Sequence, residues 1–163
     1  MRRQIKRLKS PKKPTYTSAT AKPWGILNFF KKSMAGAKRM EMIIPKINQT
    51  KTIEIDFKSN MENQRLENDK EVVMYRAACE LINNSILHSG ASRIEIDLNK
   101  HEKFVTLQFY DNGRGFDTST LTKEDTKGMG LSNIETRVKT VEGVFVLEST
   151  PGKGTSALIK MID

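Results

Sequence analysis

The stretch DKEVVMYRAACELINNSILHSG, residues 69–90, decides the fold. Apolar and small side chains recur along it at a spacing of four, which places them on one stripe of an α-helix. The stripe consists of Val73, Ala77, Leu81 and Ser85. We expect Asn68 or Asp69 to cap the start of this helix. The pair Ser89-Gly90 is expected to end it, because glycine readily adopts the left-handed conformation of a helix C-cap.

Short segments on both sides of this helix alternate apolar and polar residues, a pattern typical of half-buried β-strands. The expected strands are residues 52–57, 93–98, 104–110, 144–148 and 155–161. A second helix is expected over residues 131–141, and the short links 99–103 and 150–154 close two hairpins. This order predicts an α+β fold, a two-layer sandwich with a mixed, largely antiparallel sheet and its helices on one face.

The charge of the chain is divided unevenly. Residues 1–40 contain 12 of the 28 Lys and Arg residues and no Asp or Glu, whereas the rest carries 16 basic and 19 acidic side chains. We therefore expect a basic N-terminal arm over residues 1–45 and a folded domain over residues 46–163. Within the arm, an apolar and basic stretch from Gly25 to Ile44 predicts a helix that Pro45 ends.

The basic arm has two interpretations. An excess of Lys and Arg suits contact with a nucleic acid or an anionic membrane surface, and it equally suits a solvated tail. The arm contains no recognised nucleic-acid-binding motif, which favours the tail. We therefore expect no nucleic-acid partner.

Composition excludes several classes of protein. No apolar run approaches the roughly 20 residues that span a bilayer, so we expect no membrane segment in this chain. The first ten residues have no apolar segment behind them, so no secretory signal is expected. The single cysteine, Cys79, excludes an internal disulfide and favours a reducing, cytoplasmic location. Only two histidines, His88 and His101, are present, which excludes most histidine-rich metal sites.

Three polar side chains lie at a spacing of four on the first helix, namely Glu80, Asn84 and His88. An asparagine oxygen is a hard ligand that suits Mg²⁺, which completes its shell with water and substrate phosphates. A nearby carboxylate such as Glu80 can orient or deprotonate a nucleophile. The exposed polar face of an ordinary amphipathic helix has the same pattern, so this feature alone leaves both interpretations open.

Three glycine-containing motifs follow the helix. Residues 111–116, DNGRGF, end an expected strand, where Asp111 can accept a hydrogen bond from an exocyclic amine such as that of adenine. Their glycines allow a ligand to approach the backbone, although a simple turn also explains them. Residues 128–131, GMGL, precede a helix and offer backbone N–H groups to an anion. Residues 151–155, PGKGT, suit a hairpin turn.

Together and in this order, the four motifs resemble the Bergerat-type (GHKL) ATP-binding fold, which includes gyrase B, Hsp90, MutL and histidine kinases. The stretches ELINNSILHSGAS, GMGLSNIETRVKTVEG and ESTPGKGTS are most similar to the sensor histidine kinases of two-component systems. The resemblance covers about residues 50–163. It implies a Bergerat-type sandwich that binds ATP and Mg²⁺.

The resemblance also implies a set of nucleotide-binding residues, which is Asn84, His88, Asp111, Gly113, Gly115, Gly128, Gly130, Leu131 and Thr155. Within this set, Asn84 matches the residue that holds Mg²⁺ against the phosphates. Asp111 matches the aspartate that reads the adenine amino group, and Thr155 matches a threonine that helps to bind adenine. Outside the set, Glu80 matches the carboxylate implicated in acid–base catalysis.

The same resemblance assigns roles to the glycines and to a loop. Gly113 and Gly115 match the glycines that let adenine and ribose approach the backbone. Gly128 and Gly130 match the second glycine box, whose loop meets the phosphates. Residues 117–127 match the mobile ATP lid, and their polar composition suits movement.

The sequence departs from the family pattern in two places. Many of these kinases have a Lys or Arg three residues after the box asparagine, where this chain has Leu87. A cationic contact to the phosphates is therefore missing unless another basic residue replaces it. A phosphoacceptor histidine is also expected on a dimerising helix before this domain, and no histidine precedes His88. We therefore expect a catalytic fragment, or a kinase-derived protein that acts on another chain.

The resemblance thus implies an ATP-binding catalytic domain of a sensor histidine kinase. Such a domain donates the γ-phosphate of Mg-ATP to a histidine on a separate dimerisation domain and, through it, serves a response regulator. It is cytoplasmic, either alone or as the cytoplasmic part of a membrane-anchored sensor. Two alternatives are an anti-sigma-type serine kinase, which shares the fold, and a non-catalytic module that binds nucleotide or a partner protein. The wording of the GMGL motif and the following helix favours the histidine kinases over the serine kinases.

Overall fold

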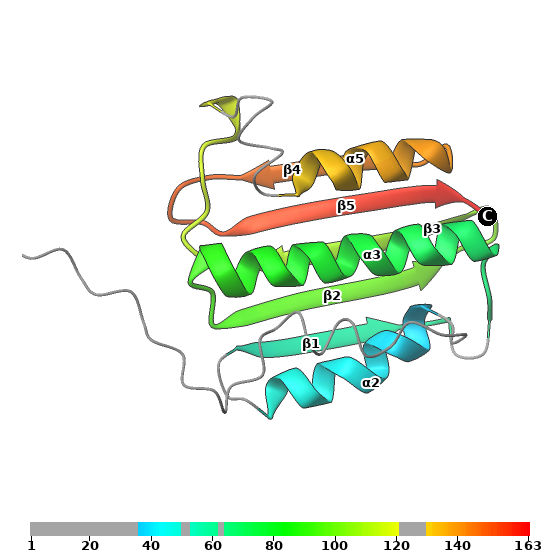
Figure 1. Ribbon diagram of the computed structural model, residues 1–163, viewed down its shortest axis with the longest axis horizontal. Helices are drawn as coiled ribbons and strands as arrows, with labels where there is room; N and C mark the ends of the chain where they lie inside the picture. Colours follow the sequence, from blue (N-terminus) through cyan, green and yellow to red (C-terminus); the bar gives the residue numbers. More distant parts are fainter. Residues whose placement is uncertain (1–35, 50–52, 62–63, 121–129) are drawn as a thin grey trace, which may run out of the picture.

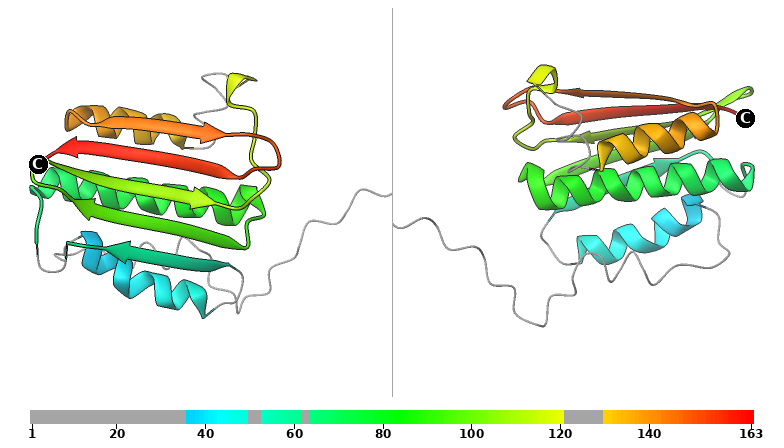
Figure 2. Two further views of the ribbon diagram at one scale, coloured as in Figure 1. Left: turned by 180° about the vertical axis from the view of Figure 1, so that it is seen from behind. Right: turned by 45° about the horizontal axis from the view of Figure 1, so that its top comes forward.

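The computed structural model describes residues 36–49, 53–61, 64–120 and 130–163. These residues form two layers, a five-stranded sheet and a layer of helices that covers one of its faces (Figure 1). Seen from behind, the opposite face of the sheet carries no described helix (Figure 2, left). The predicted two-layer α+β sandwich is therefore confirmed. None of the described helices is both long and apolar enough to cross a bilayer.

The sheet has the strand order β1-β2-β3-β5-β4. The strands span Glu54–Ser59 (β1), Arg93–Lys100 (β2), Phe104–Asp111 (β3), Val144–Ser149 (β4) and Thr155–Ile162 (β5). Strands β1 and β2 are parallel, and the other three neighbouring pairs are antiparallel. Both predicted hairpins, β2–β3 and β4–β5, are therefore confirmed, as is the mixed and largely antiparallel character of the sheet.

The predicted long helix is present, and its last turn is wider than an α-helix. Helix α3 spans Asn68–Asn84 and continues into η1, Ser85–Ser89, a single π-helical turn. Gly90 ends it with a φ of 66°, as its place in the sequence predicted. The prediction of the cap was wrong, because the N-cap residue is Glu67 and no side chain caps it. A π turn at the end of an α-helix is frequent at functional sites, where it redirects side chains.

Glu71 organises the start of α3 from inside the first turn. Its carboxylate is buried. It accepts two hydrogen bonds from Arg65, one from Nε at 2.7 Å and one from Nη2 at 2.9 Å. It accepts a third from the backbone N–H of Leu66 at 3.2 Å. This ion pair also raises the pKa of Arg65 above its ordinary value, through the hydrogen bond and then the charge of Glu71. The three donors satisfy a carboxylate that burial would otherwise destabilise. They hold residues 65 and 66 against the first turn of α3, which itself has no side-chain cap.

The helix before β1 differs from its prediction. Helix α2 spans Gly36–Asn48 and contains Pro45, so the prediction that Pro45 ends the helix was wrong; residues 25–35 lie outside the described residues. A proline inside a helix costs about 3 kcal/mol because it removes one backbone hydrogen bond. The flanking side chains Ile44 and Ile47 are buried in the core, and this burial offsets the cost.

The end of α2 is also tied to the sheet. The side chain of Asn48 binds both backbone groups of Ile55 on β1, accepting from its N–H at 2.8 Å and donating to its carbonyl at 2.9 Å. This pair of hydrogen bonds extends the edge of the sheet by one side chain. It fixes the helix end where the proline would otherwise loosen it.

The core lies between the sheet and the helices. The buried strand residues are Ile94, Ile96 and Leu98 on β2, Val105, Leu107 and Phe109 on β3, and Ala157, Ile159 and Met161 on β5. Ala77 and Leu81 of α3 and Ile134 and Val138 of α5, Leu131–Thr140, belong to the same apolar cluster. Burying each of the larger side chains contributes about 1.5–3 kcal/mol. The buried residues alternate along each of these strands, as the predicted half-buried strands require, and the predicted stripe of α3 lies in the core.

Candidate functional site

A cavity of about 140 Å³ opens where η1, the end of β3, the start of β5 and the start of α5 meet, at the left-hand end of the sheet in Figure 1. Its lining includes residues from the predicted site, namely Asn84, His88, Asp111, Gly115, Leu131 and Thr155. These residues are up to 71 positions apart in the sequence, and the fold brings them to one end of the molecule. Glu80, Gly113 and Gly130 do not line this cavity, and Gly128 lies outside the described residues.

Asp111 is the most buried charged group of the site, with 2% of its surface exposed. Its Oδ2 accepts a hydrogen bond from the hydroxyl of Ser85 at 2.6 Å, and its Oδ1 accepts one from the backbone N–H of Gly113 at 2.8 Å. Each carboxylate oxygen has two lone pairs, so one acceptor position per oxygen remains after these bonds. The arrangement can therefore accept a further donor from a ligand in the cavity. Asp111 also lies directly opposite Thr155 in the β3–β5 register.

The turns formed by the DNGRGF and PGKGT motifs pack against each other and are joined by a backbone hydrogen bond. The N–H of Arg114 donates to the carbonyl of Ser89 at 2.8 Å, and the N–H of Gly152 donates to the carbonyl of Arg114 at 2.7 Å. Gly115 has a φ of 57°, and a β-carbon there would collide with the carbonyl of Thr150. The two turns thus approach each other more closely than side chains would allow. Their glycines therefore serve packing between loops, and the ligand access at Gly113 and Gly115 stays a prediction.

Ser149 fixes the direction of the hydrogen bond at Thr155. The Ser149 hydroxyl donates to the carbonyl of Gly154 at 2.8 Å and accepts from the N–H of Phe116 at 2.9 Å. A hydroxyl has a single proton, so in the 3.1 Å contact between Ser149 and Thr155 the proton comes from Thr155. The Thr155 oxygen then offers only acceptor lone pairs to the cavity. It is suited to a donor, such as an amino group or a water molecule.

Glu80, Asn84 and His88, which lie at a spacing of four in the sequence, occupy two different locations. Asn84 and His88 line the cavity, with His88 exposed on the π turn. Glu80 is half-buried and lies against Gly130, where a β-carbon would collide with its carboxylate. Gly130 is the N-cap residue of α5 and has a φ of 71°. The carboxylate is therefore held at the start of α5, while the amide and the imidazole face the cavity.

The described part of the predicted lid begins with a turn. The Asp117 carboxylate accepts hydrogen bonds from the hydroxyl of Ser119 at 2.6 Å and from its N–H at 2.9 Å. These bonds, led by the one from the hydroxyl, lower the pKa of Asp117 below its ordinary value. A short 3₁₀ turn, η2 (Thr118–Thr120), follows, and residues 121–127 of the predicted lid lie outside the described residues.

The side chains around the cavity offer few ligands for a metal ion such as Mg²⁺. Among the described residues, no group of three or more His, Cys, Asp and Glu side chains is arranged to hold a metal ion. A magnesium ion held through the Asn84 oxygen would therefore take most of its ligands from nucleotide phosphates and water, which is how Mg²⁺ is usually bound. The residues present fit this mode of binding.

Sequence reasoning missed several residues of the site. Ser85 was assigned to the buried stripe of α3, but its hydroxyl binds Asp111. Ser149 and Phe116 were not singled out, although Ser149 contacts both Thr155 and Phe116, and Phe116 lines the cavity. A serine on an otherwise apolar stripe was the available signal, because a buried hydroxyl needs a partner. No local pattern points to Ser149.

Comparisons with known proteins agree with this geometry. A family model described as "Histidine kinase-, DNA gyrase B-, and HSP90-like ATPase" matches residues 69–162. The signal transduction histidine-protein kinase/phosphatase DegS of Bacillus subtilis (strain 168) is 35% identical over 100 residues, which are 61% of this chain and 26% of DegS. DegS of Brevibacillus brevis is 27% identical over 107 residues, 66% of this chain and 27% of that protein. The chain thus spans about a quarter of the length of these relatives.

Solved structures share the fold. The catalytic domain of the histidine kinase ThkA superposes with a TM-score of 0.63 at 16% identity, over 78% of this chain and 89% of that chain. The histidine kinase domain of the blue-light activated histidine kinase EL346 from Erythrobacter litoralis gives 0.62 at 14% identity, over 80% of this chain and 66% of that chain. At these identities the likeness concerns the fold.

Proposed function

The chain belongs to the family of histidine kinase-, DNA gyrase B- and HSP90-like ATPases, and we propose that it binds Mg-ATP and donates the γ-phosphate to a histidine on a separate dimerisation domain. Its relatives in sequence are named as histidine-protein kinases. We further propose that the catalytic domain occupies residues 46–163 and that residues 1–45 are an appended basic arm. The response regulator would be reached through the dimerisation domain.

One observation carries the assignment of the adenine site. The buried carboxylate of Asp111 is held by Ser85 and Gly113 and retains free lone pairs beside the cavity. The exocyclic amine of adenine is a two-proton donor that matches such an acceptor. Thr155, which lies opposite Asp111, offers a second acceptor for the same amine or for a bridging water. We assign the base to this end of the cavity, beside the glycines at positions 113 and 115.

The phosphate end is assigned from the remaining residues. Asn84 and His88 line the cavity on the helix side, and Leu131 lines it at the first turn of α5. We assign the Asn84 oxygen to Mg²⁺, which when bound neutralises charge on the β- and γ-phosphates. Gly128 and Gly130 are assigned to the loop that meets the phosphates, because α5 presents its N-terminus there.

We assign Glu80 as the base that accepts the proton released by the imidazole of the acceptor histidine. In the transfer, a nitrogen of the acceptor histidine forms a bond to the γ-phosphorus while the bond to the ADP oxygen breaks, and the imidazole proton needs a base. The half-buried carboxylate at the start of α5 is a base of suitable kind. Positioning and charge neutralisation provide most of the catalysis of phosphoryl transfer.

The test is transfer to a separate acceptor. The chain is incubated with γ-labelled Mg-ATP and a dimerisation domain that carries a phosphoacceptor histidine, with a domain whose histidine is replaced by Gln as control. We expect label that is acid-labile and base-stable on the intact domain alone. The chain by itself should remain unlabelled, because His88 is committed to the cavity and His101 lies in the β2–β3 link, stacked on Phe104. Acid-stable label on a serine of a partner would contradict the proposal and favour a serine kinase.

Leu87 favours one alternative. Its side chain is 44% exposed, and it stands where many related kinases have a cation for the phosphates. A domain without that cation is compatible with a module that binds nucleotide without transferring phosphate. Binding of Mg-ATP without any transfer to the acceptor domain would support this second candidate.

A further inference from the structure

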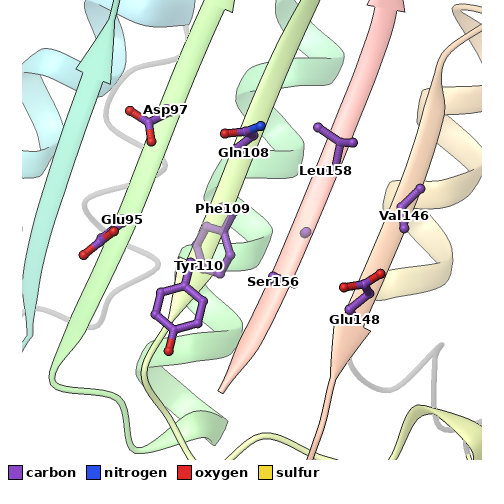
Figure 3. Close-up of a pocket in the computed structure, with 10 residues that line it drawn as sticks. Glu95, Asp97, Gln108, Phe109, Tyr110, Val146, Glu148, Ser156 and Leu158 are labelled. Atoms are coloured by element: carbon purple, nitrogen blue, oxygen red, sulfur yellow. The ribbon is translucent and has the colours of Figure 1, made fainter. Parts of the chain in front are cut away.

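The face of the sheet opposite the helices carries an open groove of about 430 Å³ across β2, β3, β5 and β4, which we call the outer groove. Figure 3 shows its side chains: Glu95 and Asp97 on β2, Tyr110 on β3, Leu158 on β5, and Val146 and Glu148 on β4. The groove and the nucleotide cavity lie on opposite faces of the sheet, because neighbouring residues of a strand point to opposite faces, and they share one lining residue, Phe109. Tyr110 faces outward, and Asp111 is buried beside the cavity.

The outer groove is acidic at its sides and apolar along its floor. Three carboxylates line it, those of Glu95, Asp97 and Glu148, and its lining contains no Lys or Arg. Glu95 forms an ion pair with Arg93 at 3.0 Å, whereas no described residue forms an ion pair with Asp97 or Glu148. Between them, Tyr110 and Val146 are 42% and 43% exposed. A ligand that is apolar in the middle and cationic at its ends would complement this groove.

The arm of this chain contains such a segment. We propose that residues 22–32, KPWGILNFFKK, dock in the outer groove of the same molecule. The segment has one lysine at its start and two at its end, with Trp24, two phenylalanines, Ile26 and Leu27 between them, and no acidic residue. Its aromatic side chains would cover the floor of the groove, and its lysines would meet Asp97 and Glu148. The segment therefore has the same order of character as the groove, cationic at its ends and apolar in the middle.

The chain is long enough for this docking. Helix α2 packs against the edge strand β1, so Gly36 is connected at the β1 side of the sheet. Gly36 lies twelve positions after Trp24, a reach of about 40 Å when extended. Docking therefore requires residues 25–35 to be extended, in place of the helix that the sequence pattern predicts there. The whole sheet is about four strand spacings wide, or about 19 Å. The tether also gives the segment an effective concentration in the millimolar range, so a weak intrinsic affinity is sufficient for occupancy.

Trp24 provides the test because it is the single tryptophan of the chain. In the full chain at low salt, we expect blue-shifted emission and a constant for quenching by acrylamide at least twofold below that of N-acetyl-tryptophanamide. Glu148→Lys and Asp97→Lys should each raise the quenching constant toward that of the free compound. The matched control is Glu135→Lys, an equal change of charge on an exposed residue of α5, and it should leave the constant unchanged.

Three outcomes would overturn the proposal. One is a tryptophan as accessible in the unmodified chain as in the free compound. Another is equal protection of Trp24 in the Glu148→Lys and Glu135→Lys variants, with circular dichroism confirming that both are folded. The third is protection that depends on protein concentration, which would assign the groove to a second copy of the chain. ATP affinity should be the same in all these variants, so failure here is distinguishable from failure of the proposed nucleotide site.

Discussion

The hydroxyl of Ser85 donates a 2.6 Å hydrogen bond to Asp111, and this contact joins the π turn η1 to the end of β3. The two residues are 26 positions apart and both are 2% exposed. The bond satisfies a buried carboxylate on one side and leaves its remaining lone pairs beside the cavity. The geometry of the proposed adenine site therefore depends on the wider turn at the end of α3.

Removing this hydroxyl tests that dependence. Ser85→Ala should lower the free energy of unfolding by about 1–3 kcal/mol, because a buried charged acceptor loses a donor. It should also weaken nucleotide binding, since the carboxylate is no longer fixed. Urea unfolding measures the first effect and calorimetric titration the second. Thr140→Ala, which removes an exposed hydroxyl of α5, is the control and should change stability by less than about 0.5 kcal/mol.

The contact between Glu80 and Gly130 predicts a specific loss on adding one methyl group. Gly130→Ala introduces both the strain of a positive φ and a collision with the Glu80 carboxylate. Gly90→Ala is the matched control, because Gly90 has a similar φ of 66° and nothing within 4 Å of the added carbon. We expect Gly90→Ala to cost about 1–2 kcal/mol and Gly130→Ala to cost more. Equal costs in thermal unfolding would contradict the contact.

A double variant separates the two causes. Combining Gly130→Ala with Glu80→Ala removes the collision and retains the strain. The stability of the double variant should then approach that of Gly90→Ala. If Glu80→Ala restores nothing, the carboxylate does not lie against Gly130.

Glu71 should be important for stability although it lies far from the cavity. Glu71→Ala removes the acceptor for Arg65 and for the N–H of Leu66, and we expect a loss of about 1.5–3 kcal/mol in chemical unfolding. Glu71→Gln retains an acceptor oxygen and should lose less. A neutral Glu71→Ala variant would show that the three hydrogen bonds do not hold the start of α3.

The strands and their faces could be predicted from the sequence because alternation along a strand is a local property. Ile94, Ile96 and Leu98 alternate with polar residues in the sequence and are buried together. Pro45 was misjudged because the burial of Ile44 and Ile47, which offsets its cost, is a tertiary effect. The contacts of Glu71 with Arg65 and Leu66, and the π turn, likewise depend on tertiary contacts that no single helical pattern contains.

The candidate site was predictable in part. Asn84, Asp111 and Thr155 stand in recognisable motifs, and the fold gathers them around one cavity. Ser85 and Ser149 are common residues whose function depends on partners distant in sequence or on hydroxyl geometry. The roles assigned to the site residues remain predictions that ligand binding must test.

Leu87 predicts a gain of affinity. Leu87→Lys introduces a cation where many related kinases have one, and an exposed charge–phosphate contact is worth about 1 kcal/mol, or roughly fivefold in affinity. The gain should appear for ATP and be absent for adenosine, which has no phosphate. Leu87→Met, which changes shape without charge, is the control. No gain for ATP would mean that this position does not face the phosphates.

The most direct measurement is calorimetric titration of the full chain and of Asp111→Asn with ATP in the presence of magnesium. The amide that replaces the carboxylate in this variant would place an NH2 donor opposite either the adenine amine or the N–H of Gly113, so one buried donor would be left unpaired at about 1–3 kcal/mol. We predict saturable binding by the unmodified chain and a loss of about 10-fold or more in the variant. Equal binding by both proteins would contradict the assignment of Asp111 as the adenine acceptor, and no binding by the unmodified chain would contradict the nucleotide site itself.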